Sequence, residues 1–404
     1  NFRVYTYGSS ASLIGTWMQR AAVGWLAWEL THDPKWVGIA VSADLIPTIF
    51  SSPIAGVLAD RLHPMRLLMV LQVLAALQAI ALAALTFSGF VTVEWLVVLT
   101  FILGLIMGFN HPVRQTSIYL LVRREDLSAA VGTTSVIFNT SRVIGPAIAG
   151  FIIHFGGAGF AFALNAVTFM IMLAALSAIR LPPQAPRERS TVSVLADIIA
   201  GYRYAFAHKG IAPTLLISLS AALLVRPAVE MLPAFVGQVF EGGADSLGLI
   251  LAANGFGAML AGIWLAWRGS AQGLVSIAIW STVLAAVALT GFAISDNFIV
   301  GTGFIFLLGI AMSLRGTATQ TLIQNAVDTK MRGRVLSLNT LIFNAGPAVG
   351  AFALGLVASW AGLLPPLYVA AGLSLAVWLW AWSRRAQLIE VLEGPDTHEG
   401  AARH

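Results

Sequence analysis

Long apolar stretches, separated by short polar segments, follow one another along almost the whole chain. Each stretch reaches roughly the 20 residues that a helix needs to cross a hydrocarbon core about 30 Å thick. Twelve are found, at approximately 6–30, 36–59, 67–88, 95–118, 129–154, 159–180, 211–237, 246–267, 273–294, 297–320, 335–359 and 364–383. The pattern predicts an all-α membrane protein with twelve transmembrane helices.

Composition supports a membrane protein and excludes several functions. Of the 404 residues, 58% are hydrophobic and 10% are charged, against roughly 45–50% and about 25% in soluble domains. The net charge of +5 lies in short gaps between apolar stretches, so we expect no nucleic-acid partner. Because the chain has no cysteine, disulfides and thiolate metal sites are excluded, and we expect neither a metal nor another cofactor.

The basic residues predict how the chain crosses the membrane. If residue 1 is cytoplasmic, most of the 23 Lys and Arg residues fall in cytoplasmic segments, and only Lys35 lies on the opposite side. Short cytoplasmic loops are typically enriched in Lys and Arg. We therefore expect a multi-pass protein with both termini in the cytoplasm.

The sequence also divides into two similar halves. Residues 181–210 form the longest polar segment, and apolar positions between Val194 and Phe206 predict an amphipathic helix there. The motif at 115–118 recurs at 320–323, and Gly145-Pro146 recurs as Gly346-Pro347. We predict two pseudo-symmetric six-helix bundles, at 1–180 and 211–388, with a linker at 181–210 and a cytoplasmic tail at 389–404.

The segment from Gly56 to Arg66 resembles the loop between helices two and three of the major facilitator superfamily, with the pattern G-x-L-A-D-R-x-G-R-R. His63 and Pro64 depart from it. The resemblance implies a cytoplasmic gate in which hydrogen bonds of Asp60 break on opening, and the depth of Arg114 suits a charge partner for Asp60. The gating residues expected in this region are Gly56, Asp60, Arg61, Arg66 and Arg114.

Small residues in the fifth stretch resemble the antiporter signature G-x8-G-x3-G-P-x2-G-G of the same superfamily, with Ser141 and Ala149 in place of two glycines. Small residues on one face permit close helix packing, and proline removes a backbone hydrogen bond. The alternative is a generic small-residue interface. The resemblance favours export and adds three gating residues, namely Gly145, Pro146 and Gly150.

Further segments resemble the branch of enterobactin-type siderophore exporters and macrolide efflux proteins. They are residues 1–3, 17–19, 112–115, 124–127 and 332–339. The resemblance implies a monomeric secondary transporter of the bacterial cytoplasmic (inner) membrane. It would export a small amphiphilic or anionic molecule, a siderophore-like metabolite or a drug, by rocker-switch alternating access.

Ionisable residues inside a membrane are costly and mark a transport pathway or a paired structural site. Arg226 and Glu230 are four residues apart and face each other on a regular helix, although Pro227 and Pro233 make that helix irregular. Asp44 has no obvious partner on its own helix. We expect Asp44 and Glu230 to exchange protons, and the substrate-binding residues to be Arg20, Trp17, Arg226, Arg142 and Arg315.

Two alternatives stay open at this point. A polytopic membrane enzyme would need convergent catalytic groups, but the seven His residues are scattered and no metalloprotease, nucleophile-elbow or P-loop motif is present. We therefore expect no enzymatic activity. A lipid or lysolipid translocator on the same fold is not separable from a metabolite exporter by sequence.

Overall fold

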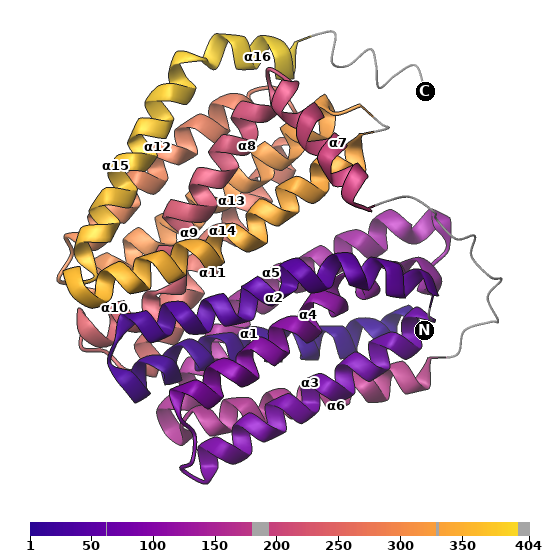
Figure 1. Cartoon of the computed structure of the whole chain (residues 1–404), viewed down its shortest axis with the longest axis vertical. Coiled ribbons are helices and arrows are strands. Elements are labelled where there is room, and N and C mark those ends of the chain that lie inside the picture. Colours follow the sequence, from indigo (N-terminus) through magenta and orange to yellow (C-terminus); the bar gives the residue numbers. More distant parts are fainter. Residues whose placement is uncertain (62, 180–193, 329–330, 395–404) are drawn as a thin grey trace. The chain divides into compact units, whose positions relative to one another are not determined.

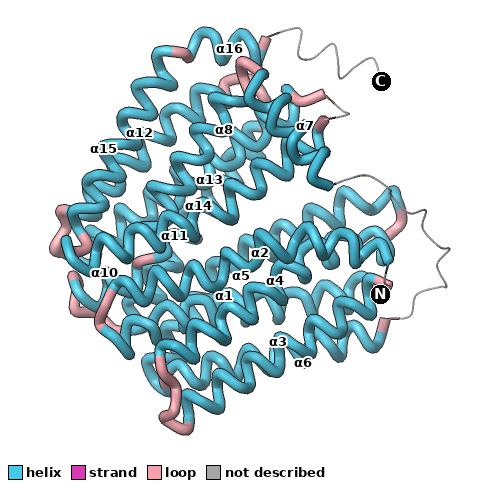
Figure 2. Tube along the Cα trace, in the orientation of Figure 1, coloured by secondary structure: helices cyan, strands magenta, loops and turns pink. Residues whose placement is uncertain are grey.

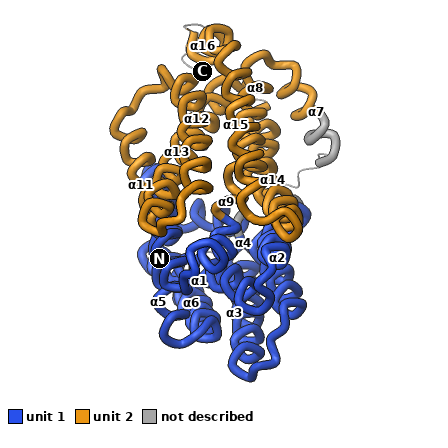
Figure 3. The backbone as a smooth tube through the Cα atoms, turned by 90° about the vertical axis from the view of Figure 1, so that its left-hand side faces the viewer, with its two compact units in different colours: residues 1–189, 230–252 blue, residues 190–229, 253–404 orange. Residues whose placement is uncertain are grey.

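The computed structural model describes residues 1–61, 63–179, 194–328 and 331–394, without the side chains of residues 52–61, 111, 124 and 194–199. All regular structure in these ranges is helical (Figure 2). The helices group into two units, formed by Asn1–Arg189 with Glu230–Ala252 and by Ser190–Val229 with Ala253–His404 (Figure 3).

The first unit contains α1 to α6, which are long helices, together with α10 and the start of α11 (Figure 1). Within it, α2 packs along α4, and α1 lies between α5 and α6. A core of buried aliphatic and aromatic side chains from α3, α4 and α6 fills this bundle. The helices are α1 (Phe2–Thr31), α2 (Pro34–Arg61), α3 (Pro64–Phe87), α4 (Val93–Leu121), α5 (Leu127–Gly156) and α6 (Ala158–Ala178).

The second half of the chain contains long helices together with several short ones. In the second unit, α12 packs against both α13 and α15. The helices are α7 (Val194–Ala207), α8 (Ile211–Ser220), α9 (Arg226–Glu230), α10 (Leu232–Gln238), α11 (Ala244–Arg268), α12 (Leu274–Ala293), α13 (Phe298–Ala326), α14 (Arg332–Ala361), α15 (Leu364–Ser383) and α16 (Arg385–Glu393).

Ten helical segments of the described chain are long and apolar enough to cross a membrane. They coincide with ten of the twelve predicted stretches. The remaining two stretches coincide with α1 and α2, which carry Arg20 and Asp44. The all-helical membrane fold is therefore confirmed, and the two other predicted stretches each carry a charged residue near the middle of their helix.

The seventh predicted stretch is interrupted, as its prolines predict. A π-helical turn at Ala221–Val225 joins α8 to α9, and α10 starts with Leu232 and Pro233. Pro227 has no backbone N–H, so it cannot bond the carbonyl of Leu223 one turn earlier. A Cβ placed at Gly350 of α14 would lie 2.5 Å from that carbonyl oxygen. The proline and the glycine together allow the two backbones to approach closely.

The amphipathic helix predicted in the linker is present as α7, whereas residues 180–193 of the linker and 395–404 of the tail lie outside the described residues. His208 follows α7, and its Nδ1 accepts hydrogen bonds from the backbone N–H groups of Gly210 and Ile211. Burial lowers the pKa of His208, and the nearby Asp328 partly opposes that shift. The neutral imidazole thus caps the start of α8.

This cap predicts how stability depends on pH. Because the folded-state pKa of His208 is lowered, the unfolded chain binds more protons than the folded chain. The contribution of this cap to the free energy of unfolding is therefore complete above the unfolded pKa of about 6.5, and it is lost as the pH falls below that value. Between about pH 7.5 and 5.5, the thermal midpoint of the purified protein should fall more than that of His208→Asn, which keeps an acceptor but cannot titrate. Equal decreases would contradict the role of His208.

Candidate functional site

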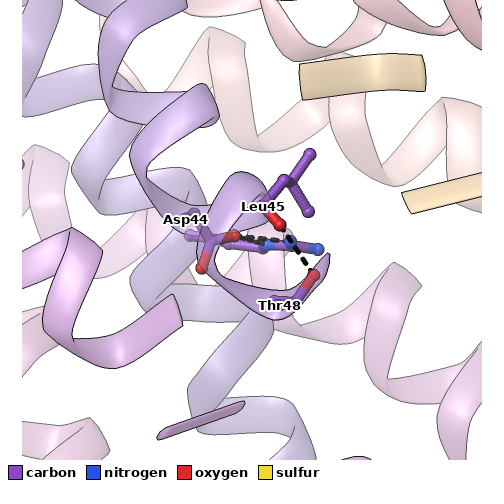
Figure 4. A network of polar contacts seen from close by, with 4 residues as sticks. Asp44, Leu45 and Thr48 are labelled. Carbon is purple, nitrogen blue, oxygen red and sulfur yellow. Dashed lines mark hydrogen bonds and ion pairs between the residues drawn. The ribbon is translucent and has the colours of Figure 1, made fainter. Parts of the chain in front are cut away.

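An ion pair joins α1 to α2 inside the first unit. The Nε atom of Arg20 donates a hydrogen bond to Oδ2 of Asp44, and its Nη2 atom forms an ion pair with the same oxygen at 2.5 Å. Figure 4 shows Asp44 on α2, one turn before Thr48, whose hydroxyl donates to the carbonyl of Leu45. Asp44 therefore has its partner on the neighbouring helix.

The Arg20 side chain is only partly enclosed by this pairing. It remains 30% exposed, whereas the Asp44 side chain is 12% exposed. A planar guanidinium has five N–H donors, of which two are used here. Arg20 can therefore bind a second anionic group at the same time as Asp44 or in its place.

A second guanidinium lies close to the same aromatic ring. The Cζ atoms of Arg20 and Arg142 lie 5.1 and 5.9 Å from the ring centre of Trp17, and Phe138 meets that ring edge-on at 5.8 Å. Such distances fall within the range of cation–π contacts. Arg142 and Phe138 are on α5, so α1 and α5 together form a cationic and aromatic cluster.

Gly145 allows this cluster to form. A Cβ at this position of α5 would lie 2.6 Å from the Cβ of Trp17 and 2.9 Å from the carbonyl oxygen of Ile14. Pro146 is buried beside it, within a continuous α5. A Cβ at Gly150, one turn further, would lie 2.7 Å from the carbonyl of Ala244. The glycine-rich segment is thus a close-packing surface.

The remaining predicted binding residues are distributed over other helices. Glu230 interacts electrostatically with Arg20, and Arg226 lies with its Cζ 4.6 Å above the ring of Phe343 on α14. Arg315 on α13 is 2% exposed, and its Nη1 has no hydrogen-bond acceptor in the described structure. The structure therefore brings together Trp17, Arg20, Arg142, Asp44 and Glu230, while Arg226 contacts Phe343 of α14 and Arg315 is buried on α13.

The predicted gating residues are only partly described. Arg114 of α4 donates to the hydroxyl oxygens of Ser9 and Ser12 on α1, at 3.0 and 2.9 Å. The Asp60 partner expected for it, together with Gly56 and Arg61, belongs to the part of α2 whose side chains lie outside the described residues. Arg66 is exposed at the start of α3. The pairing of Arg114 with Asp60 stays a prediction.

A buried amide network next to the site was not predicted. Gln19, which precedes Arg20, donates to Gln78 of α3 and accepts from Asn165 of α6. All three are at most 4% exposed. Uncharged polar residues inside apolar stretches were the available signal, because buried amides must find hydrogen-bond partners. The network fixes the turn of α1 that carries Arg20.

The chemistry available here is binding of charge and transfer of protons. Within the described residues, no cluster of three or more His, Asp or Glu side chains is arranged to hold a metal. Two guanidinium groups, a carboxylate and two aromatic rings can bind an anionic group attached to an apolar or aromatic body.

Comparison with known proteins identifies the family. The sequence profile of the family described as transmembrane secretion effectors, a branch of the major facilitator superfamily, matches residues 1–393. The chain belongs to this family. Among its relatives, the staphyloferrin A transporter of Staphylococcus aureus is 26% identical over 337 residues, covering 83% of this chain and 84% of that protein. The enterobactin exporter EntS of Salmonella typhi is also 26% identical, covering 88% and 84%.

Solved structures give the same fold for this transmembrane secretion effector. A peptide transporter matches with a TM-score of 0.77 at 12% identity, covering 97% of this chain and 95% of that one. The nucleoside transporter NupG matches with a TM-score of 0.73 at 13% identity, covering 95% and 99%. The predicted major facilitator fold is confirmed. Membership of the transmembrane secretion effector family shows that the chain is a membrane transporter of small molecules and not an enzyme.

Proposed function

We propose that the chain is a proton-coupled exporter of a small amphiphilic or anionic molecule, such as a siderophore-like metabolite or a drug. Its relatives include an enterobactin exporter and a staphyloferrin A transporter, which supports this class of cargo. Transport would proceed by rocker-switch alternating access in the inner membrane, with both termini cytoplasmic and the protein acting as a monomer.

The observation that carries the proposal is the pair of guanidinium groups around Trp17, one of which is held by a carboxylate. An anionic group of the cargo binds Arg20 and Arg142, and its apolar part lies against Trp17 and Phe138. Charge-assisted hydrogen bonds give this contact its strength and selectivity. A cationic molecule would be repelled by both guanidinium groups.

The ion pair links cargo binding to proton binding. A cargo anion and the carboxylate of Asp44 compete for Arg20, so protonation of Asp44 releases Arg20 for the cargo. By reciprocity, binding of the anion promotes protonation of Asp44. A cationic cargo would instead compete with the proton for Asp44. The sign of the proton change on binding therefore distinguishes these two classes of cargo.

Co-transport of a proton with an anion is compatible with export. A cargo with two or more negative charges keeps a net negative charge after Asp44 carries one proton with it. Outward movement of that net charge is favoured by a potential that is negative inside, by about 2.3 kcal/mol per charge at 100 mV. The membrane potential would therefore drive export, whereas an inward-directed proton gradient would oppose the exit of the proton. Glu230 would modulate this step through its electrostatic interaction with Arg20.

The other charged and glycine-rich positions have supporting roles in the proposal. Arg226 and Arg315 would extend the positive pathway in the second half of the chain. Arg114, with Gly56, Asp60, Arg61 and Arg66, would form the cytoplasmic gate. The close packing at Gly145, Pro146 and Gly150 would hold the helices that separate when the opposite side opens.

The cargo can be identified by comparing metabolites exported by cells with and without the protein, followed by reconstitution into proteoliposomes. Enterobactin and staphyloferrin A are the first compounds to test, because relatives are named for them. We expect an anionic compound to be transported, with a strong decrease for Arg20→Ala and Arg226→Ala. Transport of only cationic or neutral compounds, unaffected by these substitutions, would refute the proposal.

A further inference from the structure

Three tryptophans meet at one end of α12 and α15, far along the chain from the candidate transport site. The ring centre of Trp280 lies 6.0 Å from that of Trp378 and 5.2 Å from that of Trp382, and the last two are 6.1 Å apart. Trp280 and Trp382 are 52% and 37% exposed. A cluster of indole rings on an apolar helix surface is typical of the membrane–water interface.

Two arginines follow directly at the junction of α15 and α16. The Cζ of Arg385 lies 4.5 Å from the ring centre of Trp382, and that of Arg384 lies 5.1 Å from the ring centre of Trp380. Both arginine side chains are exposed. The Arg385 guanidinium is therefore placed at the polar edge of the tryptophan cluster, whereas that of Arg384 lies beside Trp380, which is not one of the three clustered rings. Both side chains remain open to a ligand.

The short helix α16 keeps these arginines in place. Its residues Leu388 and Leu392 are buried against the second unit. The carboxylate of Glu393 accepts hydrogen bonds from the backbone N–H groups of Gly273 and Val275 at the start of α12, at 2.8 and 2.7 Å. The Glu393 carboxylate is thus hydrogen-bonded to the N-terminus of α12. The other carboxylate of α16 belongs to Glu390, which is five residues from Arg385. It therefore lies about 140° around the helix, on a different side from Arg385.

One further donor in the cluster lacks an acceptor. The Nε1 atom of Trp378 is buried and has no hydrogen-bond partner within the described structure. Buried indole N–H groups usually find a partner. The cluster therefore combines one exposed cation, Arg385, with an unused hydrogen-bond donor and an outward-facing aromatic surface, and a second exposed cation, Arg384, precedes Arg385 in the chain.

We infer that Trp280, Trp378, Trp382, Arg384 and Arg385 form a binding site for one anionic phospholipid. The phosphate lies against the two guanidinium groups, and the acyl chains follow the exposed faces of Trp280 and Trp382. Basic groups beside a transmembrane helix end attract anionic headgroups, and the indole rings sit at the depth of the lipid ester groups. On the predicted topology the site faces the cytoplasmic leaflet.

Native mass spectrometry of the full-length protein in detergent tests this site, with phosphatidylglycerol and phosphatidylcholine as the added lipids. We expect preferential retention of phosphatidylglycerol by the wild type. The double variant Arg384→Gln/Arg385→Gln should bind it about 25-fold more weakly, from roughly a fivefold loss per arginine. Arg332→Gln removes an exposed arginine at the start of α14 and is the matched control, which should bind like the wild type.

A second measurement places the lipid at the tryptophans. Phosphatidylglycerol with brominated acyl chains should quench tryptophan fluorescence of the wild type more than brominated phosphatidylcholine does. Trp280→Phe should reduce that difference while lipid retention persists. Equal retention of both lipids by the wild type, or undiminished phosphatidylglycerol retention by the double variant, would overturn the inference and leave the cluster as an interfacial anchor. Neither readout depends on transport.

Discussion

Replacing Arg20 by alanine is expected to reduce transport of an anionic cargo by about 10- to 100-fold, because a hydrogen bond to a charged group contributes about 1.5–3 kcal/mol. The substitution also leaves the carboxylate of Asp44, whose side chain is 12% exposed, without its partner. The measurement is uptake of the identified anion into proteoliposomes across a pH range. Transport by Arg20→Ala equal to that by the wild type would exclude Arg20 from cargo binding.

Two further variants separate charge from proton coupling. Arg20→Lys keeps the positive charge but loses the planar two-nitrogen contact with Asp44, so partial transport is expected. Asp44→Asn imitates the protonated carboxyl, so it should keep anion binding and lose the increase of affinity at low pH. An unchanged pH profile in Asp44→Asn would show that another group carries the proton.

Replacing Gly104 by alanine is expected to destabilise the first unit by roughly 1–3 kcal/mol, the usual range for overpacking a tightly packed core. A Cβ at Gly104 would overlap the carbonyl oxygen of Asp44, so α4 would have to move away from α2. Because that movement displaces the backbone of Asp44, transport should fall as well. The measurements are the thermal midpoint in detergent and transport in proteoliposomes.

The internal repeat supplies a second test of this packing. Gly309 of α13 lies 205 residues after Gly104, the same offset as between the two Gln-Thr motifs. A Cβ there would overlap the carbonyl oxygen of Asn254 on α11, so Gly309→Ala should destabilise the protein similarly. Gly132→Ala is the control, since nothing lies within 4 Å of its Cβ. Equal midpoints for all three variants would contradict the close-packing argument.

The sequence predicted the fold well because transmembrane helices are specified locally. Twenty apolar residues between polar segments are recognisable one stretch at a time. The interruption near Arg226 was likewise predictable, since Pro227 and Pro233 act on their own backbone. Among the described residues, the helix predicted between Val194 and Phe206 from the spacing of apolar residues is present as α7.

The contacts of the candidate site could not be predicted in the same way. Asp44 has no obvious partner on its own helix in the sequence, because its partner Arg20 lies on α1. Arg142 is 125 residues from Trp17, and their approach depends on the absence of a side chain at Gly145. Charged residues inside apolar stretches can be recognised in the sequence itself. Which of them pair with one another depends on how the helices pack.

In the proposed mechanism, an anion and a proton bind together at Arg20 and Asp44. This coupled binding is tested most directly by adding the identified anionic cargo to purified protein in weakly buffered detergent solution with a pH indicator. We expect proton uptake by the wild type, approaching one proton per bound anion at pH values where Asp44 is ionised before binding. We expect no uptake by Asp44→Asn. Proton release on binding, or uptake that persists in Asp44→Asn, would contradict it.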